Sequence, residues 1–361
     1  MLLREVKDIK ALIAMSGGVD SSVAAKLVSD MGYECIGCTM KLYNNLAADN
    51  LCERTCCSLD DVEDARSVAA KLGMPYYVFN FIDSFKKTVI DKFIHSYESG
   101  VTPNPCIDCN RYMKFDALYR KARILGCDYI VTGHYAQIEY DGKQYYLKKA
   151  IDETKDQSYV LYSMTQSQLA QTMLPLGNML KSEARKVAKC NGFQNSGKLD
   201  SQDICFVPDG DYASMIERLT GRKSRDGYFV DMEGHILGKH KGIINYTIGQ
   251  RKGLGLSSIR PMYVCKLSPE TNTIVLGYEN DLYSRKAIVS EFHWISEKVP
   301  ERSFRCKAKI RYRQKEQWAT VMPINDDSTQ ILFDEPQRAI TAGQAAVLYD
   351  GDIVLGGGVI V

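Results

Sequence analysis

A seven-residue run near the N-terminus has the composition of a phosphate-binding loop. Ser16-Gly17-Gly18-Val19-Asp20-Ser21-Ser22 follows an apolar stretch, residues 11–14, and leads into apolar residues at helical spacing. The two glycines let the backbone turn with its N–H groups exposed, and the serine hydroxyls and a helix N-terminus complete a cradle for phosphate oxygens. The run lacks the lysine of a Walker A loop. The alternative, a strand-to-helix turn that is merely rich in glycine and serine, is disfavoured by the tight clustering.

A second motif brings two thiols together. In residues 102–110, Thr-Pro-Asn-Pro-Cys-Ile-Asp-Cys-Asn, two prolines and two asparagines predict a non-helical loop that holds Cys106 near Cys109. Taken alone, this CxxC pattern is either structural or half of a zinc site.

A third motif contains a single cysteine. Cys205 follows Asp200-Ser201-Gln202-Asp203-Ile204 and precedes Phe206-Val207, so polar residues give way to apolar ones around the thiol. Taken alone, this pattern favours an inert buried cysteine.

The segments around these motifs alternate between strand and helix. Residues 35–42 and 75–81 have the composition of strands, and residues 58–73 and 114–126 have apolar side chains at helical spacing. Residues 128–136 form a further apolar strand that runs into a glycine turn. This alternation predicts a doubly wound parallel sheet with ligands at the carboxyl ends of its strands.

The pattern changes twice along the remaining chain. We predict a nucleotide-binding and catalytic domain over residues 1–160 and a mainly helical middle domain over residues 161–227. From residue 228 to 361, short strands separated by glycine turns predict one or two small β-barrels. The predicted fold class is therefore α/β, followed by a small helical domain and a C-terminal β-barrel.

Composition limits the classes of function. The 361 residues contain no leader-like segment and no run of about eighteen apolar residues, so we expect a cytoplasmic protein without a membrane span. Twelve cysteines in such a chain are expected to be free thiols, available for metal or redox chemistry. The net charge of +2 gives no bulk attraction for nucleic acid, so any RNA contact must use local basic patches.

The motifs resemble those of a known family. Ser16 to Ser22 resembles the signature of the PP-loop ATP pyrophosphatases, which cleave ATP between the α and β phosphates. The TPNPxxxCN pattern, KDQSY at residues 155–159, Ile204-Cys205-Phe206 and residues 343–360 together resemble the tRNA-specific 2-thiouridylases. The resemblance covers nearly the whole chain in the right order. It implies a tRNA-uridine 2-sulfurtransferase that uses ATP and acts on tRNA with a wobble uridine.

The resemblance also implies roles for individual residues. Cys109 is implied to be the nucleophile and Cys205 the carrier of a persulfide, in a family with a disulfide bond. The residues implied to bind ATP are Ala14, Met15, Ser16, Gly17, Gly18, Val19, Asp20, Ser21, Met40 and Gly133. Those implied to contact the target base or the rest of the tRNA are Asn104, Pro105, Cys106, His134, Lys155, Asp156, Gln157, Arg311, Tyr312 and Gln344. The middle domain is expected to contact tRNA as well.

The implied chemistry has two steps. Adenylation of the carbon 2 oxygen of uridine would create a leaving group, and a sulfane sulfur on Cys205 would replace it, with Cys109 cleaving the S–S bond or releasing sulfide. Asp20 is the only acidic residue of the loop and is expected to help bind Mg²⁺. A sulfur-donor protein, such as a cysteine desulfurase or a relay protein, is the expected partner. Arg311 and Arg313 flank Tyr312. This pattern is consistent with phosphate contact and base stacking on RNA, and equally with a solvated strand face.

One position departs from the family. Cys106 stands where the commonest pattern has aspartate, and a thiolate is a soft metal ligand. Cys106, Cys109 and Cys205 are therefore possible ligands of a 4Fe-4S cluster with one open iron. The persulfide and cluster routes both stay open, with the third cysteine favouring the cluster slightly. Three further cysteines, Cys52, Cys56 and Cys57, are one ligand short of a tetrahedral metal site.

Two other functions compete with thiolation. A PP-loop adenylating ligase that acts on a small molecule would not need Cys109 and Cys205. A non-catalytic iron–sulfur or zinc RNA-binding protein would not need the phosphate loop. The chain has both features, which favours thiolation.

Overall fold

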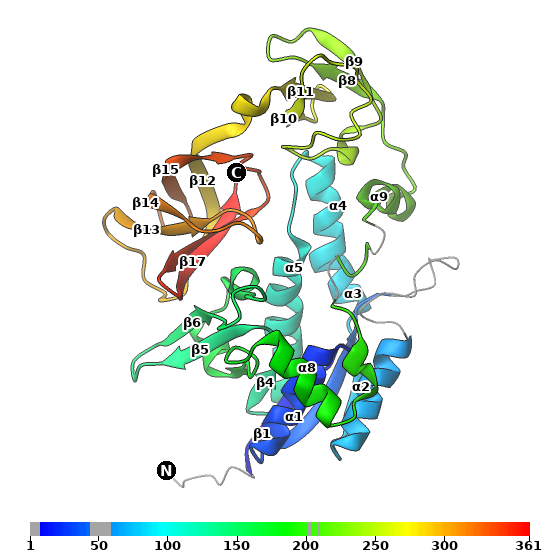
Figure 1. Cartoon of the computed structure of the whole chain (residues 1–361), viewed down its shortest axis with the longest axis vertical. Coiled ribbons are helices and arrows are strands. Elements are labelled where there is room, and N and C mark those ends of the chain that lie inside the picture. The colour runs from blue at the N-terminus through cyan, green and yellow to red at the C-terminus, as the bar shows by residue number, and fades with distance from the viewer. Residues whose placement is uncertain (1–7, 44–58, 201–203, 208–209) are drawn as a thin grey trace.

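The computed structural model describes residues 8–43, 59–200, 204–207 and 210–361 (Figure 1). Cys52, Cys56 and Cys57 lie outside the described residues, so their role stays a prediction. Among the described helices, none has the length and apolar character that a membrane crossing requires.

A five-stranded parallel sheet forms the first unit, in the order β3-β2-β1-β4-β7. The central strand β1 is almost completely buried, as its apolar sequence predicts for a sheet covered on both faces. This confirms the predicted parallel α/β sheet. Its strands are β1 (Lys10–Ala14), β2 (Glu34–Lys41), β3 (Tyr76–Asn80), β4 (Tyr129–Val131) and β7 (Thr172–Met173).

Small apolar residues let helices pack closely on this sheet. Val23 of α1 (Val19–Asp30), Ala65 of α2 (Leu59–Lys71) and Ala184 of α8 (Lys181–Cys190) belong to one buried cluster with β1. Helix α8 and strand β7 both come from the region 161–227, so part of that region extends the first unit. The predicted domain boundaries themselves stay a prediction. The remaining short helices of the region are η5 (Ser158–Leu161), α7 (Gln166–Ala170), η6 (Gln194–Gly197) and α9 (Tyr212–Thr220).

Two composite helices contain π-helical stretches. Residues 82–98 run through α3 (Ile82–Phe85), the π-helical η3 (Lys86–Ile90) and α4 (Asp91–Glu98). Residues 105–124 run through α5 (Pro105–Asp108), the π-helical η4 (Cys109–Ala117) and α6 (Leu118–Ile124). The CxxC segment is thus helical and not a loop, because Pro105 suits the first helical turn and the Asn104 side chain accepts a hydrogen bond from the Cys106 N–H at 3.2 Å.

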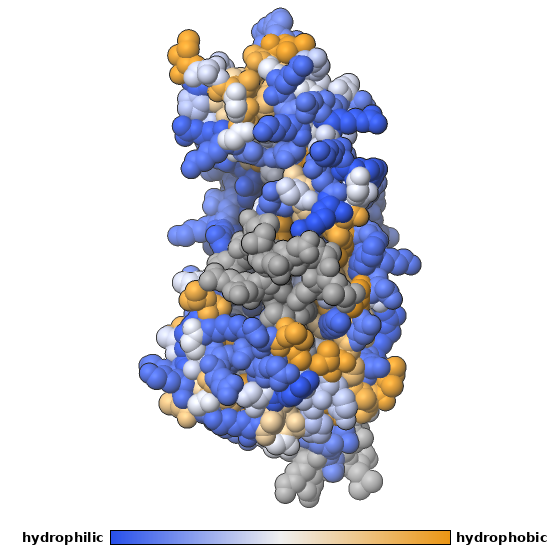
Figure 2. All heavy atoms as spheres, turned by 90° about the vertical axis from the view of Figure 1, so that its right-hand side faces the viewer, coloured by the Kyte–Doolittle hydropathy of each residue, from blue (hydrophilic) through white to orange (hydrophobic). Residues whose placement is uncertain are grey.

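A four-stranded sheet in the order β10-β11-β8-β9 forms a middle unit at the upper end of the molecule (Figure 1). Figure 2 shows mainly hydrophilic side chains on one face of the molecule, with apolar groups at this upper end. The elements of the middle unit are β8 (Gly227–Val230), β9 (Ile236–His240), η7 (Ile243–Asn245), β10 (Tyr263–Ser268), β11 (Thr273–Gly277) and η8 (Glu279–Leu282).

The C-terminal strands form a closed barrel, as predicted. Their order is β12-β15-β14-β13-β16-β17, and a further pairing of β12 with β17 closes the sheet. A hairpin from the first unit, β5 (Ala136–Tyr140) with β6 (Tyr145–Lys149), joins the same sheet where Ile353 pairs with Lys148. The barrel strands are β12 (Tyr283–Trp294), β13 (Phe304–Lys309), β14 (Gln317–Pro323), β15 (Thr329–Arg338), β16 (Ala345–Asp350) and β17 (Ile353–Ile360).

Candidate active site

The loop between β1 and α1 has the geometry of an anion cradle. Gly17 has φ +74°, and a Cβ there would lie 2.3 Å from the carbonyl oxygen of Asp61, so only glycine fits. The Ser21 hydroxyl donates to the Gly18 carbonyl at 3.1 Å and accepts from the Ser16 N–H at 3.1 Å. Gly18 caps α1 without a side chain, which leaves the first N–H groups of the helix for a ligand. These residues fit the phosphates of ATP.

The other residues predicted to bind ATP lie around this loop. Gly133, in the turn after β4, is so close to α1 that a Cβ would lie 2.7 Å from the Ser21 nitrogen. Met15 and Val19 are buried beside the loop, and Ala14 ends β1. Met40 lies near the carboxyl end of β2 and packs against the buried cluster that includes Leu12 and Cys38. All of these positions are at the carboxyl edge of the parallel sheet, where ligands of such sheets bind.

An ion network that the sequence did not predict joins the loop to the third motif. Lys181 at the start of α8 is buried, and its ammonium lies 2.6 Å from Asp20 and 2.9 Å from Asp200. Asp200 also pairs with Lys155 at 2.9 Å and with Arg185 at 2.8 Å. Burial alone would raise the pKa of Asp200, but the hydrogen bonds from Lys181 and Lys155 lower it to about 2.

Protein donors already satisfy the carboxylate of Asp20. The Tyr135 hydroxyl donates to it at 2.9 Å, and both of its oxygens lie within 2.7 Å of the Lys181 ammonium. Magnesium binding at Asp20 therefore requires Lys181 to move. On the other side of the loop, the Asn195 amide donates to the Gly17 carbonyl and to the Ser22 hydroxyl, both at 2.9 Å. Residues after β7 thus hold the loop from two sides.

Cys109 and Cys205, 96 positions apart in the sequence, meet on one apolar cluster. Both pack against the buried side chains of Leu42, Phe85, Val89 and Met113. Met40, predicted to line the ATP site, packs against the same cluster. Cys205 is therefore not the fully buried cysteine that its local sequence favoured, since both thiols are partly exposed.

Aromatic side chains hold the segment that carries Cys205. The ring of Phe206 lies between those of Phe85 and Phe93, with centroids 5.7 and 5.3 Å away. The Tyr43 hydroxyl donates to the carbonyl oxygen of Cys205 at 2.9 Å. Cys109 is the first residue of the π-helical η4. Such π-helical stretches are frequent at functional sites.

Cys106 is exposed, one helical turn before Cys109. Burial first, and then the charges of Asp156 and Cys106, raise the pKa of Tyr312 on the barrel. Among the described residues, the sulfur atoms of Cys106, Cys109 and Cys205 do not all lie within 4.8 Å of one another. Asn104 and Pro105 were predicted to contact the target base. In the structure Asn104 caps helix α5 and Pro105 is buried in its first turn.

The barrel holds the segment before Cys106. The Gln344 side-chain amide donates to the Thr102 carbonyl at 2.8 Å, and the Thr102 N–H donates to the Ala342 carbonyl at 3.0 Å. Gly343 has φ +87°, and a Cβ there would lie 2.3 Å from a methyl group of Val101. Gln344, which was predicted to contact tRNA, thus holds the backbone of the segment before Cys106.

The predicted tRNA-binding residues around β4 and β6 make internal hydrogen bonds. His134 is buried between the Thr132 hydroxyl at 2.7 Å and the Lys114 ammonium at 3.1 Å. Burial first, and the charge of Lys114 second, hold the pKa of His134 well below its usual value, so its ring is neutral. Asp156 accepts from the Ala150 N–H at 3.1 Å, and Gln157 accepts from the Tyr135 N–H at 2.9 Å.

Arg311 and Tyr312 differ from each other in environment. The Arg311 guanidinium donates to the Ala339 carbonyl and the Thr341 hydroxyl, both at 3.0 Å, so it faces the barrel wall. Tyr312 is 37% exposed, and the Lys309 ammonium lies 5.7 Å from its ring centroid. The sequence pattern Arg311-Tyr312-Arg313 alone could not show that Arg311 faces the barrel wall.

Comparison with known proteins identifies the family. Residues 9–209 match the model of the tRNA methyl transferase HUP domain, residues 215–278 the tRNA methyl transferase PRC-barrel domain, and residues 284–360 the aminomethyltransferase β-barrel domain. The tRNA-specific 2-thiouridylase MnmA of Acetivibrio thermocellus is 52% identical over 97% of this chain and 99% of its own length. The chain belongs to the tRNA-specific 2-thiouridylase family. The enzyme of the same name from Clostridioides difficile is also 52% identical, over 97% of this chain and 98% of its own length.

A solved structure of lower identity also resembles this 2-thiouridylase family member. A 4-thiouridine synthetase in complex with RNA and ATP matches with a TM-score of 0.36 and 21% identity, over 59% of this chain and 50% of its own. The three matched regions follow the three units of the fold: the parallel sheet with its helices, the middle unit and the closed barrel. Family membership thereby favours thiolation over the small-molecule ligase.

Proposed function

We propose that the chain catalyses ATP-dependent 2-thiolation of the wobble uridine of tRNA, acting in the cytoplasm. One observation supports this most strongly. Cys109 and Cys205 share an apolar cluster with Met40, which lies at the carboxyl edge of the sheet that carries the phosphate loop. A sulfur-bearing thiol and an ATP-activated base can therefore meet in one place.

In the first step, the loop of Ser16 to Ser22 binds the phosphates of ATP, and Mg²⁺ accompanies the nucleotide. The carbon 2 oxygen of the uridine attacks the α phosphate, and pyrophosphate leaves. The N-terminus of α1 and the hydroxyls of Ser16 and Ser21 stabilise the negative charge of the phosphates. Lys181 adds positive charge beside the loop, and Lys155 pairs with Asp200, the other carboxylate that Lys181 contacts. The base must leave its stack to reach this site, at a cost of a few kcal/mol.

In the second step, the terminal sulfur of a Cys205 persulfide attacks carbon 2 and AMP leaves. The Cys109 thiolate then attacks the Cys205 sulfur, which breaks the S–S bond to the base and leaves 2-thiouridine. A Cys109–Cys205 disulfide forms, and an external thiol must reduce it before the next cycle. A sulfur-donor protein, such as a cysteine desulfurase or a relay protein, reloads Cys205.

The cluster route differs in how sulfur is held. Cys106, Cys109 and Cys205 would be the thiolate ligands of a 4Fe-4S cluster, and its open iron would carry the sulfide. The donor atoms suit iron, and Cys106 and Cys109 lie three residues apart in one helix. The shared apolar cluster joins Cys109 to Cys205 without Cys106, which supports the persulfide route as the first choice.

Single-turnover assays test the proposal. Cys205→Ser and Cys109→Ser should still convert ATP to pyrophosphate in the presence of tRNA, because the phosphate loop is intact, yet form no 2-thiouridine. Leu199→Ser, which changes an exposed side chain of the same segment, is the matched control and should thiolate normally. Full thiolation by either cysteine variant would refute the assigned roles.

A further inference from the structure

The middle unit carries a strong excess of positive charge. Residues 215–278 contain ten lysines and arginines against five aspartates and glutamates, a net charge of +5, whereas the whole chain has +2. The rest of the chain is therefore net negative by 3. Because RNA carries one negative charge per phosphate, the middle unit is the part of the molecule that attracts it most.

Part of this charge is concentrated on the loop of residues 249–262, before β10. Arg251, Lys252 and Arg260 are exposed in this loop, while Leu254 is buried in the core of the unit. Gly249, Gly253 and Gly255 have φ values of +86°, +78° and +68°, which only glycine adopts easily. Leu254 thus anchors the loop to the core of the middle unit, while the three cations remain exposed to solvent.

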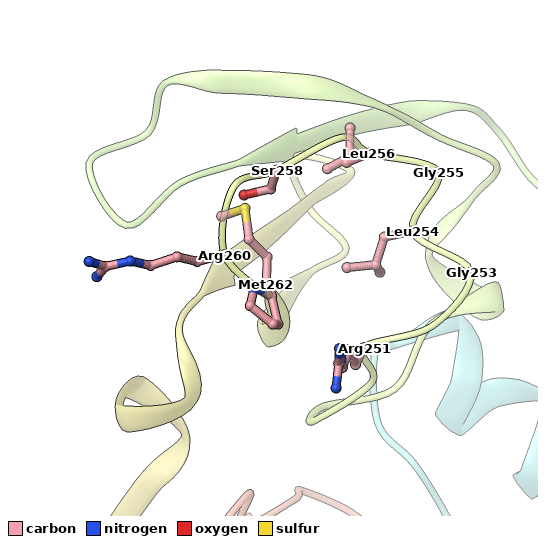
Figure 3. A pocket seen from close by; sticks show the side chains of 9 residues that line it. Arg251, Gly253, Leu254, Gly255, Leu256, Ser258, Arg260 and Met262 are labelled. Carbon is pink, nitrogen blue, oxygen red and sulfur yellow. The ribbon is translucent and has the colours of Figure 1, made fainter.

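Figure 3 shows this arrangement from close by. Leu254 and Met262 line a pocket of about 210 Å³, and the side chain of Arg260 extends away from it. In the part of the chain that the structure describes, no carboxylate lies within 4.0 Å of the charged groups of Arg251, Lys252 or Arg260. By contrast, Arg222 of the same unit pairs with Glu98 at 2.6 Å.

The base of the loop adjoins the barrel at two further arginines. A Cβ on Gly249 would lie 3.5 Å from a guanidinium nitrogen of Arg338 and 3.9 Å from one of Arg311. The Arg338 guanidinium lies 5.3 Å from the ring centroid of Tyr263, where the loop ends. Arg311 is followed by Tyr312, whose pKa is raised by burial first and then by the charges of Asp156 and Cys106. Arg338 also pairs with Glu279 at 3.0 Å, so the positive charge that has no paired carboxylate among the described residues lies on Arg251, Lys252 and Arg260 of the loop.

We infer that Arg251, Lys252 and Arg260 form a basic track that binds the phosphate backbone of the tRNA outside its anticodon loop. This inference rests on the proposed function, because a target base at Cys106 places the tRNA at one end of the track. Contacts of flexible, exposed cations with phosphates position an RNA without reading its sequence. The track explains how a chain with a net charge of +2 binds RNA.

The test compares full-length tRNA with its isolated anticodon stem-loop. The triple variant Arg251→Ala, Lys252→Ala, Arg260→Ala should bind full-length tRNA roughly tenfold more weakly at 0.1 M salt. The slope of log K against log salt concentration should become shallower by about 2 to 3, as expected for the loss of three phosphate contacts. Affinity for the stem-loop should be unchanged. The double variant Arg251→Lys, Arg260→Lys, which keeps all three positive charges, should bind tRNA like the wild type.

A control variant removes the same charge elsewhere. Arg123→Ala, Lys186→Ala, Lys189→Ala changes exposed cations of the first unit and should leave both the affinity and the slope as in the wild type. An unchanged salt slope in the loop variant, or an equal loss of affinity for the stem-loop, would overturn the track. Thiolation of the stem-loop by the wild type is measured in parallel, so that a failure of the proposed function is seen separately.

Discussion

The ammonium of Lys181 lies 2.9 Å from a carboxylate oxygen of Asp200, and the same ammonium lies 2.6 Å from Asp20 in the phosphate loop. Asp200 is five residues before Cys205. One buried cation thus contacts both the loop that fits ATP and the start of the motif that carries the second cysteine. Because the phosphates of ATP would enter beside this cation, nucleotide binding must alter its pairing with the two carboxylates.

Lys181→Met should abolish most ATP turnover. The change removes the charge beside the phosphates and leaves two carboxylates without their shared partner, so tRNA-dependent release of pyrophosphate should fall about 100-fold or more. Binding of tRNA, measured by filter retention, should stay within about twofold of the wild type. Lys186→Met changes an exposed lysine of the same helix and should behave like the wild type. Normal pyrophosphate release by Lys181→Met would show that the network has no role in the first step.

Cys106→Asp separates the two sulfur routes. If a persulfide on Cys205 carries the sulfur, this variant should thiolate within about threefold of the wild type without any iron. If the three thiolates hold a cluster, an oxygen ligand should bind iron less well, and the variant should lose iron and acid-labile sulfide. Metal analysis of anaerobically purified protein is the measurement. We expect the first result, and cluster loss together with activity loss would reverse that expectation.

His134 should make the protein less stable in mild acid. Its pKa is held well below 6.5 by burial and by Lys114, so the unfolded chain takes up a proton that the folded chain does not. Stability contributed by the neutral ring is complete above about pH 6.5 and decreases as the pH falls below it. The drop in Tm between pH 7.5 and 5.5 should be smaller for His134→Gln than for the wild type. An identical drop in both proteins would contradict a neutral buried ring.

Gln344→Ala should impair thiolation through the segment before Cys106. The change leaves the Thr102 carbonyl without its donor from the barrel, at a cost of about 1 kcal/mol. We expect kcat/KM for tRNA to fall roughly fivefold to tenfold while the Kd for ATP is unchanged. Gln317→Ala, on barrel strand β14, is the control. The idea fails if Gln344→Ala has the kcat/KM of the wild type.

Local sequence was sufficient to predict the glycine turns between β1 and α1 and after β4. Gly17 and Gly133 are fixed by close backbone approaches that hardly any other residue permits, and such constraints leave clear signals in a sequence. The order of strands and helices likewise predicted the parallel sheet and the barrel. The helical start at Pro105 was missed because a proline followed by further polar residues indicates a loop as readily as a first helical turn.

Contacts between distant segments could not be predicted. Lys181 meets Asp20 across 161 positions, and no local pattern distinguishes this lysine from the exposed ones of the same helix. The inward orientation of Arg311 depends on acceptors at Ala339 and Thr341, which only the closed barrel brings near. The pairing of Cys109 with Cys205 is a prediction from family resemblance, and the structure packs both cysteines against one apolar cluster.

The identity of the nucleotide products tests the central claim most directly. Purified protein is incubated with a wobble-uridine tRNA, α-labelled ATP and a persulfide donor, and the labelled products are counted against 2-thiouridine in digested tRNA. Adenylation of carbon 2 predicts one AMP and one pyrophosphate for each 2-thiouridine formed, and no ADP. Formation of ADP and phosphate in step with 2-thiouridine would contradict the account.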